Sequence, residues 1–341
     1  METKILKINS PDDENIKAVG EILRDGGLAA IPTETVYGLA GNALDGKCAE
    51  KIFSAKGRPS DNPLIVHISN LSQWEPLVKE IPDSALALAR KFWPGPLTII
   101  LPKSDLIPEE VSGGLDTVAV RMPENEIARA IIESAGVPLA APSANLSGKP
   151  SPTCASHVID DMTGRIDAIV DSGECNVGVE STVLSLAVYP PRLLRPGQVT
   201  PEMLTEILGE IEIDDAVFDK LLDGQQAASP GMKYKHYSPD APVVLIKGSF
   251  NDFSRYVNEN ADEGILALCF EGEERELSVP CVTYGKKNDP SSQAKHIFDA
   301  LRKVDKMGAK QVFARFPEND GMGLAVFNRL LRAAAFNIIE L

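Results

Sequence analysis

The sequence lacks the regular cysteine spacing on which zinc sites and disulfide frameworks depend. Its five cysteines stand far apart, and none belongs to a Cys-x-x-Cys pair. Paired or repeated spacing is the usual signature of both kinds of site. The scatter therefore predicts neither a zinc site nor a disulfide framework, and it is typical of a protein from a reducing compartment.

Long apolar runs are also missing. No stretch approaches the roughly 18 consecutive apolar residues that indicate a membrane-spanning helix. The first residues, Met1-Glu-Thr-Lys-Ile5, lack the basic segment and apolar stretch of a signal peptide. The sequence thus predicts a soluble, cytoplasmic protein that binds no membrane.

An excess of positive charge is absent as well. The chain has 34 lysines and arginines against 49 aspartates and glutamates, for a formal net charge of −15. Proteins that coat nucleic acid or anionic membranes do so through lysine and arginine. Any contact with tRNA would therefore be local or made through a partner.

Several catalytic motifs are missing too. The sequence contains no GxxxxGK[ST], HExxH or GxSxG, and Gly321-Met-Gly323 lacks the third glycine of a dinucleotide fingerprint. Only four histidines are present. His67 stands at the end of a predicted strand, whereas His157 and His296 fall on amphipathic helical patterns and are predicted to be surface residues.

The length and the pattern of elements predict two domains. At 341 residues the chain exceeds what one hydrophobic core usually holds. Strands and helices up to residue 209 form a first α/β domain, and residues 210–242 read as a linker. Within it, residues 229–239 hold prolines, tyrosines, lysines and a histidine, which favours a loop that docks on something. Strand–helix alternation over 243–341 predicts a small, mostly parallel, Rossmann-like sheet.

Four cationic side chains stand where a strand or helix gives way to a loop with proline or glycine: Lys56, Arg58, Arg121 and Arg195. Each has hydroxyl or amide residues beside it. Any one of them alone is best interpreted as a surface ion pair. Four in the same context instead favour convergence on one concave site, where they would neutralise a triphosphate and a carboxylate.

Seven motifs, in order along the chain, carry a family resemblance. They are Pro32-Thr-Glu-Thr-Val-Tyr-Gly-Leu39, Lys56-Gly-Arg-Pro59 with Asn62-Pro-Leu-Ile-Val-His67, Trp93-Pro-Gly-Pro-Leu-Thr98, Val120-Arg-Met-Pro123, Ala141-Pro-Ser-Ala-Asn145, Gly178-Val-Glu-Ser-Thr182 and Leu194-Arg-Pro-Gly197. Together they strongly resemble the YrdC-like threonylcarbamoyl-adenylate synthases. Ser229-Pro-Gly-Met-Lys-Tyr-Lys-His-Tyr237 and the C-terminal α/β unit resemble the longer, two-domain Sua-type members.

The resemblance implies a twisted, mainly parallel open sheet that encloses a large, positively charged cavity. It also implies a nucleotidyltransferase that makes L-threonylcarbamoyl-AMP and pyrophosphate from L-threonine, bicarbonate or CO2, and ATP, with Mg2+ accompanying the ATP and no metal held by protein side chains. A separate tRNA threonylcarbamoyl transferase complex would pass the threonylcarbamoyl group to position 37 of tRNAs that read ANN codons.

Roles for individual residues follow from the resemblance alone. Threonine would be held by Thr35, His67, Arg121, Ala141 and Ser181, with its carboxylate paired to Arg121. ATP or the adenylate would be held by Lys56, Arg58, Asn62, Thr117, Ser143, Ser151, Arg195 and Tyr234. Lys56 and Arg58 are the candidate catalytic residues, and the loop that carries Tyr234 would close over the nucleotide and exclude water.

Two other functions are compatible with such a sheet. One is a non-catalytic module that binds RNA or tRNA on the same concave surface, which the net charge of −15 disfavours. The other is a carbamoyl transferase related to hydrogenase maturation. That enzyme would need acylphosphatase and zinc-finger segments, and this sequence has no Cys-x-x-Cys pair.

Overall fold

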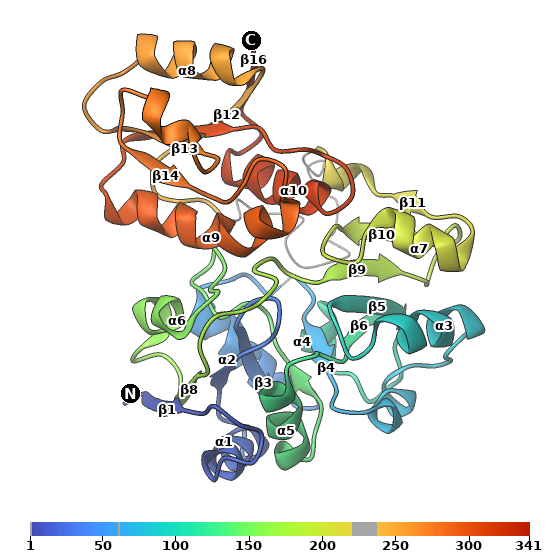
Figure 1. Ribbon diagram of the computed structural model, residues 1–341. Coiled ribbons are helices and arrows are strands. Elements are labelled where there is room, and N and C mark those ends of the chain that lie inside the picture. Colours follow the sequence, from blue (N-terminus) through green and yellow to red (C-terminus); the bar gives the residue numbers. More distant parts are fainter. Residues whose placement is uncertain (1, 61, 220–236) are drawn as a thin grey trace.

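The computed structural model describes residues 2–60, 62–219 and 237–341, and these residues form two sheets with helices on their faces (Figure 1). The strands of the larger sheet are β1 (Lys4–Lys7), β2 (Ala29–Ile31), β3 (Gly38–Asn42), β4 (Ile65–His67), β5 (Leu97–Pro102), β6 (Thr117–Arg121), β7 (Leu139–Ala140), β8 (Ala168–Asp171), β9 (Thr182–Ser185), β10 (Arg192–Arg195) and β11 (Glu212–Ile213). Their order across the sheet is β1-β8-β2-β3-β7-β4-β6-β5-β9-β10-β11.

This large sheet is mixed rather than mainly parallel. β1–β8, β2–β8, β4–β6, β5–β9 and β10–β11 pair in parallel. β2–β3, β3–β7, β4–β7, β5–β6 and β9–β10 pair antiparallel. The expected open α/β sheet is confirmed, but the parallel bias was wrong, because hairpin-like returns such as β2 to β3 replace helical crossovers at several points.

Helices cover both faces of the large sheet. They are α1 (Asn15–Arg24), α2 (Gly46–Lys56), α3 (Asp83–Phe92), α4 (Glu109–Ser112), α5 (Glu126–Ala135), α6 (Ala155–Met162) and α7 (Pro201–Leu208). α1 and α5 pack on one face together with Ala29 and Ile31, whereas α2, α3, α6 and α7 share a core with Ala30. Neighbouring residues of a strand point to opposite faces, so two cores lie on either side of the sheet.

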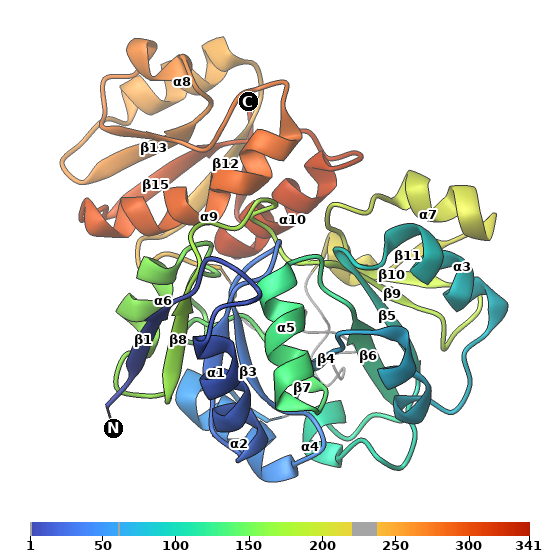
Figure 2. The same ribbon diagram turned by 60° about the horizontal axis from the view of Figure 1, so that its bottom comes forward.

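The second sheet is fully parallel, with β14 (Cys281–Thr283), β13 (Ile265–Cys269), β15 (Gln311–Arg315), β12 (Val243–Lys247) and β16 (Ile338–Glu340) in that order. It confirms the small Rossmann-like sheet expected from the sequence. Helix α8 (Phe250–Glu259) covers one face. Helices α9 (Pro290–Lys306) and α10 (Gly323–Ala333) cover the face that looks toward the large sheet (Figures 1 and 2).

The start of the predicted linker is ordered against both units. β11 pairs with β10 of the large sheet. A short 3-10 turn, Asp215–Val217, then accepts hydrogen bonds on its carbonyl oxygens from Asn328 and Arg332 of α10. The part of the chain described here thus continues the large sheet beyond residue 209, while the domain limits proposed from the sequence stay a prediction. No helix in that part is both long and apolar enough to cross a membrane.

Candidate active site

A cavity opens in the large sheet beside β4 and β6, where several loops meet. Its lining is rich in hydroxyl and charged side chains and comprises Thr33, Thr35, Val36, Gly38, Lys56, Arg58, Ile65, His67, Arg121, Ala141, Pro142, Ser143, Asn145, Ser147, Gly148, Ser151, Glu180, Ser181, Arg195 and Tyr237. All four cations singled out in the sequence are on this list. Each is less than one-tenth exposed, so none is a surface ion pair.

Helix α2 delivers Lys56 and Arg58 to the cavity. Asp45 caps the start of the helix by accepting a hydrogen bond from the Lys47 backbone at 2.9 Å. Gly57 ends it in the left-handed conformation at φ 62°, which glycine adopts without strain. Lys56 is therefore the last helical residue, and Arg58 follows the turn.

Lys56 is held by a neighbouring loop. Its Nζ donates to the carbonyl oxygens of Ser143 and Asn145, the latter at 2.7 Å. Burial, and after it the nearby Arg58, lower the pKa of Lys56 well below its usual value. An anionic ligand in the cavity would favour the charged ammonium, so Lys56 has the chemistry of a phosphate-binding residue.

Arg121, at the end of β6, makes the most constrained contacts of the site. Its Nη2 lies 2.7 Å from Oε1 of Glu34, and both side chains are about 4% exposed or less. Nη1 donates to the Thr35 hydroxyl at 2.9 Å, and Nε to the Gly95 carbonyl at 3.3 Å. A buried guanidinium of this kind can bind the carboxylate of a ligand. The ligand would either replace Glu34 as the partner of Arg121 or bind beside it.

Arg195 and Ser181 line the cavity as a bonded pair. Arg195 follows the register shift between β9 and β10. Its Nε donates to the Ser181 carbonyl at 3.0 Å and its Nη2 to the Ser181 hydroxyl at 3.1 Å. The Ser181 hydroxyl is also 2.8 Å from that of Thr98. The pair therefore presents a fixed guanidinium and hydroxyl group to a ligand.

His67 ends β4 beside Arg121, since the two residues are paired in register. Its Nδ1 lies 3.1 Å from the Ile65 carbonyl oxygen. Burial, followed by the charge of Arg121, lowers the pKa of His67 to about 3. The ring is thus neutral at physiological pH and serves as a hydrogen-bonding wall rather than as a cation.

This shift predicts a pH dependence of folding. An unfolded histidine has a pKa of about 6.5, so between pH 6.5 and 3 the unfolded chain binds a proton that folded His67 does not. The free energy of unfolding should therefore be highest above pH 6.5 and fall on acidification, by up to about 1.4 kcal/mol per pH unit from this residue. Urea unfolding of His67→Gln between pH 7 and 4.5 should show a shallower dependence than the parent chain.

The exposed His296→Gln is the matched control, because it removes an imidazole from the surface and leaves the cavity unchanged. Equal slopes for the parent chain and His67→Gln would contradict the assignment of a buried, neutral His67.

Most residues implied by the family resemblance reach this cavity. They are Thr35, Lys56, Arg58, His67, Arg121, Ala141, Ser143, Ser151, Ser181 and Arg195. Asn62 is fully buried next to Arg58, whose Nη2 lies 3.4 Å from the Asn62 carbonyl oxygen, and Thr117 lies at the other end of β6 from Arg121. Neither is part of the cavity lining. Tyr234 falls outside the described residues. The binding roles of all thirteen residues, including the ten that line the cavity, stay predictions.

The sequence reasoning overlooked two carboxylates and a tyrosine. Glu34 pairs with Arg121, and Glu180 accepts from Ser151 and from Arg329 of α10. Tyr237, at φ 61°, lies buried on the cavity wall against Phe298 of α9, with their ring centroids 5.1 Å apart. A signal for the acids was available: each stands among apolar and hydroxyl residues in a motif, and buried arginines need counter-charges.

The surface prediction for His157 was wrong. This residue is only 4% exposed, and its Nε2 lies 3.3 Å from Asp299 of α9. The helical pattern places His157 on the outer side of α6, but α9 of the second unit covers that side. His296 is exposed, as expected.

The fold and the cavity define a two-unit α/β protein with a buried cavity rich in cationic and hydroxyl side chains. Residues 21–197 match the Sua5–YciO–YrdC family model, described as "Telomere recombination", and residues 199–335 match the model for the C-terminal domain of threonylcarbamoyl-AMP synthase. The chain belongs to the threonylcarbamoyl-AMP synthase family.

Similar proteins are found in distant organisms. The threonylcarbamoyl-AMP synthase of Pyrococcus abyssi is 45% identical over 346 residues, covering 99% of each chain, and that of Bacillus subtilis is 44% identical over 336 residues, covering 97% of this chain and 96% of its own. The crystal structure of Pyrococcus abyssi Sua5 complexed with L-threonine superposes with a TM-score of 0.94 at 45% identity. It covers 99% of this chain and 100% of that one.

Proposed function

We propose that this chain synthesises L-threonylcarbamoyl-AMP from L-threonine, bicarbonate or CO2, and ATP, with release of pyrophosphate. The relatives that carry this enzyme name match nearly the whole chain. The observation that carries the proposal is the convergence of Lys56, Arg58, Arg121 and Arg195 on one buried cavity. Four cations and one carboxylate, Glu180, belong to the described lining, and this balance suits a triphosphate together with an amino-acid carboxylate.

The threonine half of the site is built around Arg121. The substrate carboxylate would take a guanidinium edge of Arg121, and the Thr35 hydroxyl, already 2.9 Å from that guanidinium, would complete the contact. His67 and Ser181 line the same part of the cavity and offer neutral hydrogen-bonding groups to the substrate amine or hydroxyl. The relative with L-threonine bound supports this choice of amino acid.

The nucleotide half comprises Lys56, Arg58, Ser143, Ser151 and Arg195, which line the remaining wall. The carbamate formed on the threonine amine is a weak oxygen nucleophile. It would attack the α-phosphorus of ATP, a new phosphorus–oxygen bond would form, and the bond to pyrophosphate would break. Because neither reactant needs a protein nucleophile, the chain contributes placement and neutralisation of the charge that builds up on the phosphates.

Mg2+ would enter with ATP and supply further neutralisation of phosphate charge. The two carboxylates near the cavity, Glu34 and Glu180, are already paired with Arg121 and Arg329. The described residues contain no group of three or more His, Cys, Asp or Glu side chains placed to hold a metal ion. Phosphate oxygens and water rather than side chains would therefore hold the ion.

The product would serve tRNA modification. A mixed anhydride of a carbamate and AMP is labile in water, so it requires a partner that consumes it promptly. We place that partner in a tRNA threonylcarbamoyl transferase complex acting on position 37 of ANN-decoding tRNAs in the cytoplasm. The net charge of −15 favours hand-over of the small intermediate above direct tRNA binding by this chain.

A single assay tests the proposal. Purified protein is incubated with ATP, Mg2+ and bicarbonate, with and without L-threonine, and pyrophosphate is measured together with the nucleotide products. Pyrophosphate and threonylcarbamoyl-AMP should appear only when threonine is present. Threonine-independent pyrophosphate, or none under either condition, would overturn the proposal, and retained binding of tRNA without turnover would favour an RNA-binding module.

A further inference from the structure

Segment 143–151, which borders the nucleotide half of the cavity, is held by side chains of the C-terminal unit. The segment supplies Ser143, Asn145, Ser147, Gly148 and Ser151 to the lining. Arg302 of α9 bonds to the segment directly. Arg329 of α10 bonds to Glu180, which in turn bonds to Ser151 of the segment. Both arginines are buried, with Arg329 fully so.

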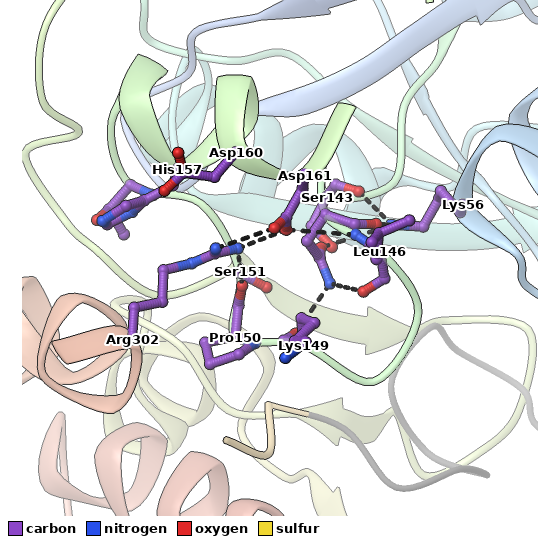
Figure 3. A network of polar contacts seen from close by, with 12 residues as sticks. Lys56, Ser143, Leu146, Lys149, Pro150, Ser151, His157, Asp160, Asp161 and Arg302 are labelled. Carbon is purple, nitrogen blue, oxygen red and sulfur yellow. Dashed lines mark hydrogen bonds and ion pairs between the residues drawn. The ribbon is translucent and has the colours of Figure 1, made fainter. Parts of the chain in front are cut away.

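Arg302 bonds the segment directly. Its Nη2 donates to the Pro150 carbonyl oxygen at 2.6 Å and to Oδ2 of Asp161 on α6 at 2.7 Å, and its Nη1 lies 3.2 Å from Oδ1 of Asp161. Asp161 Oδ2 in turn accepts from the Leu146 backbone at 3.4 Å. In Figure 3 the guanidinium group of Arg302 lies between Asp161 and Pro150, and Lys56 lies at the other end of the network.

The same network continues to Lys56. The side-chain amide of Asn145 donates to the carbonyl oxygens of Leu146 at 2.7 Å and Lys149 at 2.9 Å. Lys56 donates to the carbonyl oxygens of Asn145 and Ser143. Hydrogen bonds thus run without a break from Arg302 of the C-terminal unit to the candidate catalytic lysine (Figure 3).

Arg329 acts on the end of the segment through one intermediate. Its Nε donates to Oε2 of Glu180 at 2.7 Å, and Oε1 of Glu180 accepts from the Ser151 hydroxyl at 2.5 Å. Although burial alone raises the pKa of Glu180, the Arg329 and Arg195 guanidiniums lower it below its usual value. Glu180 is therefore an anion that fixes the orientation of the Ser151 hydroxyl.

A glycine, Gly178, permits the two units to pack closely against each other. A Cβ on Gly178, which has φ 85°, would lie 2.4 Å from the Lys295 Cα and 2.5 Å from the Ala294 carbonyl oxygen of α9. Only glycine permits that approach. Because Glu180 is two residues away, the close packing brings its carboxylate within reach of Arg329.

We propose that Arg302 and Arg329 are positioning residues for nucleotide binding: the C-terminal unit sets the affinity for ATP by holding segment 143–151 at Pro150 and Ser151. This inference rests on the proposed function.

The side chains of Arg121 and Thr35 bond to one another and to Thr33, Glu34 and Gly95. The C-terminal unit reaches this half through the backbone, because Gly178 packs on α9 and donates to the Thr35 carbonyl oxygen at 3.1 Å. The two arginine side chains are therefore expected to act on ATP binding more than on threonine binding.

An exposed ion pair between α9 and α6, the two helices that Arg302 and Asp161 also join, provides a matched control. Lys306 of α9 lies 3.1 Å from Asp160 of α6, with the two side chains 65% and 48% exposed. Both residues of this pair lie outside segment 143–151. Lys306→Met thus removes an inter-unit ion pair without touching the segment, and a surface pair of this kind contributes little to stability.

The experiment measures the KM for ATP and for L-threonine, and the dissociation constant of ATP alone, in full-length Arg302→Lys, Arg329→Lys and Lys306→Met variants. Lysine keeps the charge but cannot bond both partners of each arginine. The two arginine variants should raise the KM and dissociation constant for ATP about 10- to 100-fold, as for a misplaced binding group, with the KM for threonine within about twofold of the parent value. Lys306→Met should match the parent in both.

Three results would overturn the inference: unchanged ATP affinity in both arginine variants, a parallel loss for ATP and threonine, or an equal loss in Lys306→Met. If Arg302→Lys unfolds, the double variant Arg302→Met, Asp161→Leu removes both charges and leaves no unpaired buried ion, and it should still weaken ATP binding selectively. Inactive parent protein would instead contradict the proposed function, since direct ATP binding is measured separately from turnover.

Discussion

Arg121→Ala should abolish threonine-dependent turnover at ordinary threonine concentrations. The substitution removes the guanidinium that we propose binds the substrate carboxylate, and truncating one partner of a buried charge pair costs about 2–5 kcal/mol. At about 1.4 kcal/mol per tenfold change, threonine affinity should fall roughly 30-fold to several thousand-fold. Calorimetric titration of threonine into the variant measures this directly, and ATP binding should change far less.

Two further variants separate binding from stability. Arg121→Ala leaves the Glu34 carboxylate buried without its partner, so Arg121→Ala, Glu34→Gln removes that uncompensated charge and should restore the melting temperature but not threonine binding. Arg192→Ala breaks an exposed pair with Glu212 at 2.8 Å and should have no effect on either substrate. Near-parent threonine affinity in a folded Arg121→Ala variant would refute the role of this residue.

The sequence was sufficient to predict the convergence of the cations. Each cation stands at or just after the end of a helix or strand: Lys56, Arg121 and Arg195 are the last residues of their elements, and Arg58 follows α2. The elements of an α/β sheet bring such ends together. His67 was expected at the end of a strand, and β4 ends there. Local patterns of this kind depend only on residues close in the chain, which is why they could be interpreted without the fold.

Contacts between distant parts of the chain could not be predicted in this way. The prediction that His157 is exposed failed because Asp299 packs against it. Asp299 lies 142 positions further along the chain (299 − 157). Glu180 and Arg329 meet across 149 positions. Hydrophobic periodicity reports which side of a helix is apolar, but it does not reveal a polar side that a second unit covers with its own charges.

The same limit applies to the identity of the docking tyrosine. The dense loop at residues 229–239 was expected to dock, and Tyr237 lies against Phe298 and beside the cavity. The left-handed backbone of Tyr237 is unusual for a tyrosine. Nothing in the order of residues singles out Tyr237, because this polar stretch contains two tyrosines.

Lys56→Ala should eliminate ATP–pyrophosphate exchange while leaving threonine binding intact. The ammonium lines the cavity and donates to segment 143–151, and loss of one preorganised charge-stabilising donor lowers turnover about 10²- to 10³-fold. Exchange of labelled pyrophosphate into ATP in the presence of threonine and bicarbonate measures the step, and calorimetry measures threonine affinity in the same protein.

The difficulty is that Lys56 also anchors segment 143–151 through its bonds to Ser143 and Asn145. Lys51→Ala, on the same helix, is the matched control, since its Nζ donates to the Gly26 carbonyl at 2.6 Å on the outer surface. A purely structural Lys56 would lower the melting temperature and weaken both substrates together, and retained exchange would exclude a catalytic role. Selective loss of exchange with threonine binding preserved assigns the Lys56 charge to the phosphates, because the threonine half of the cavity is anchored separately on β4 and β6.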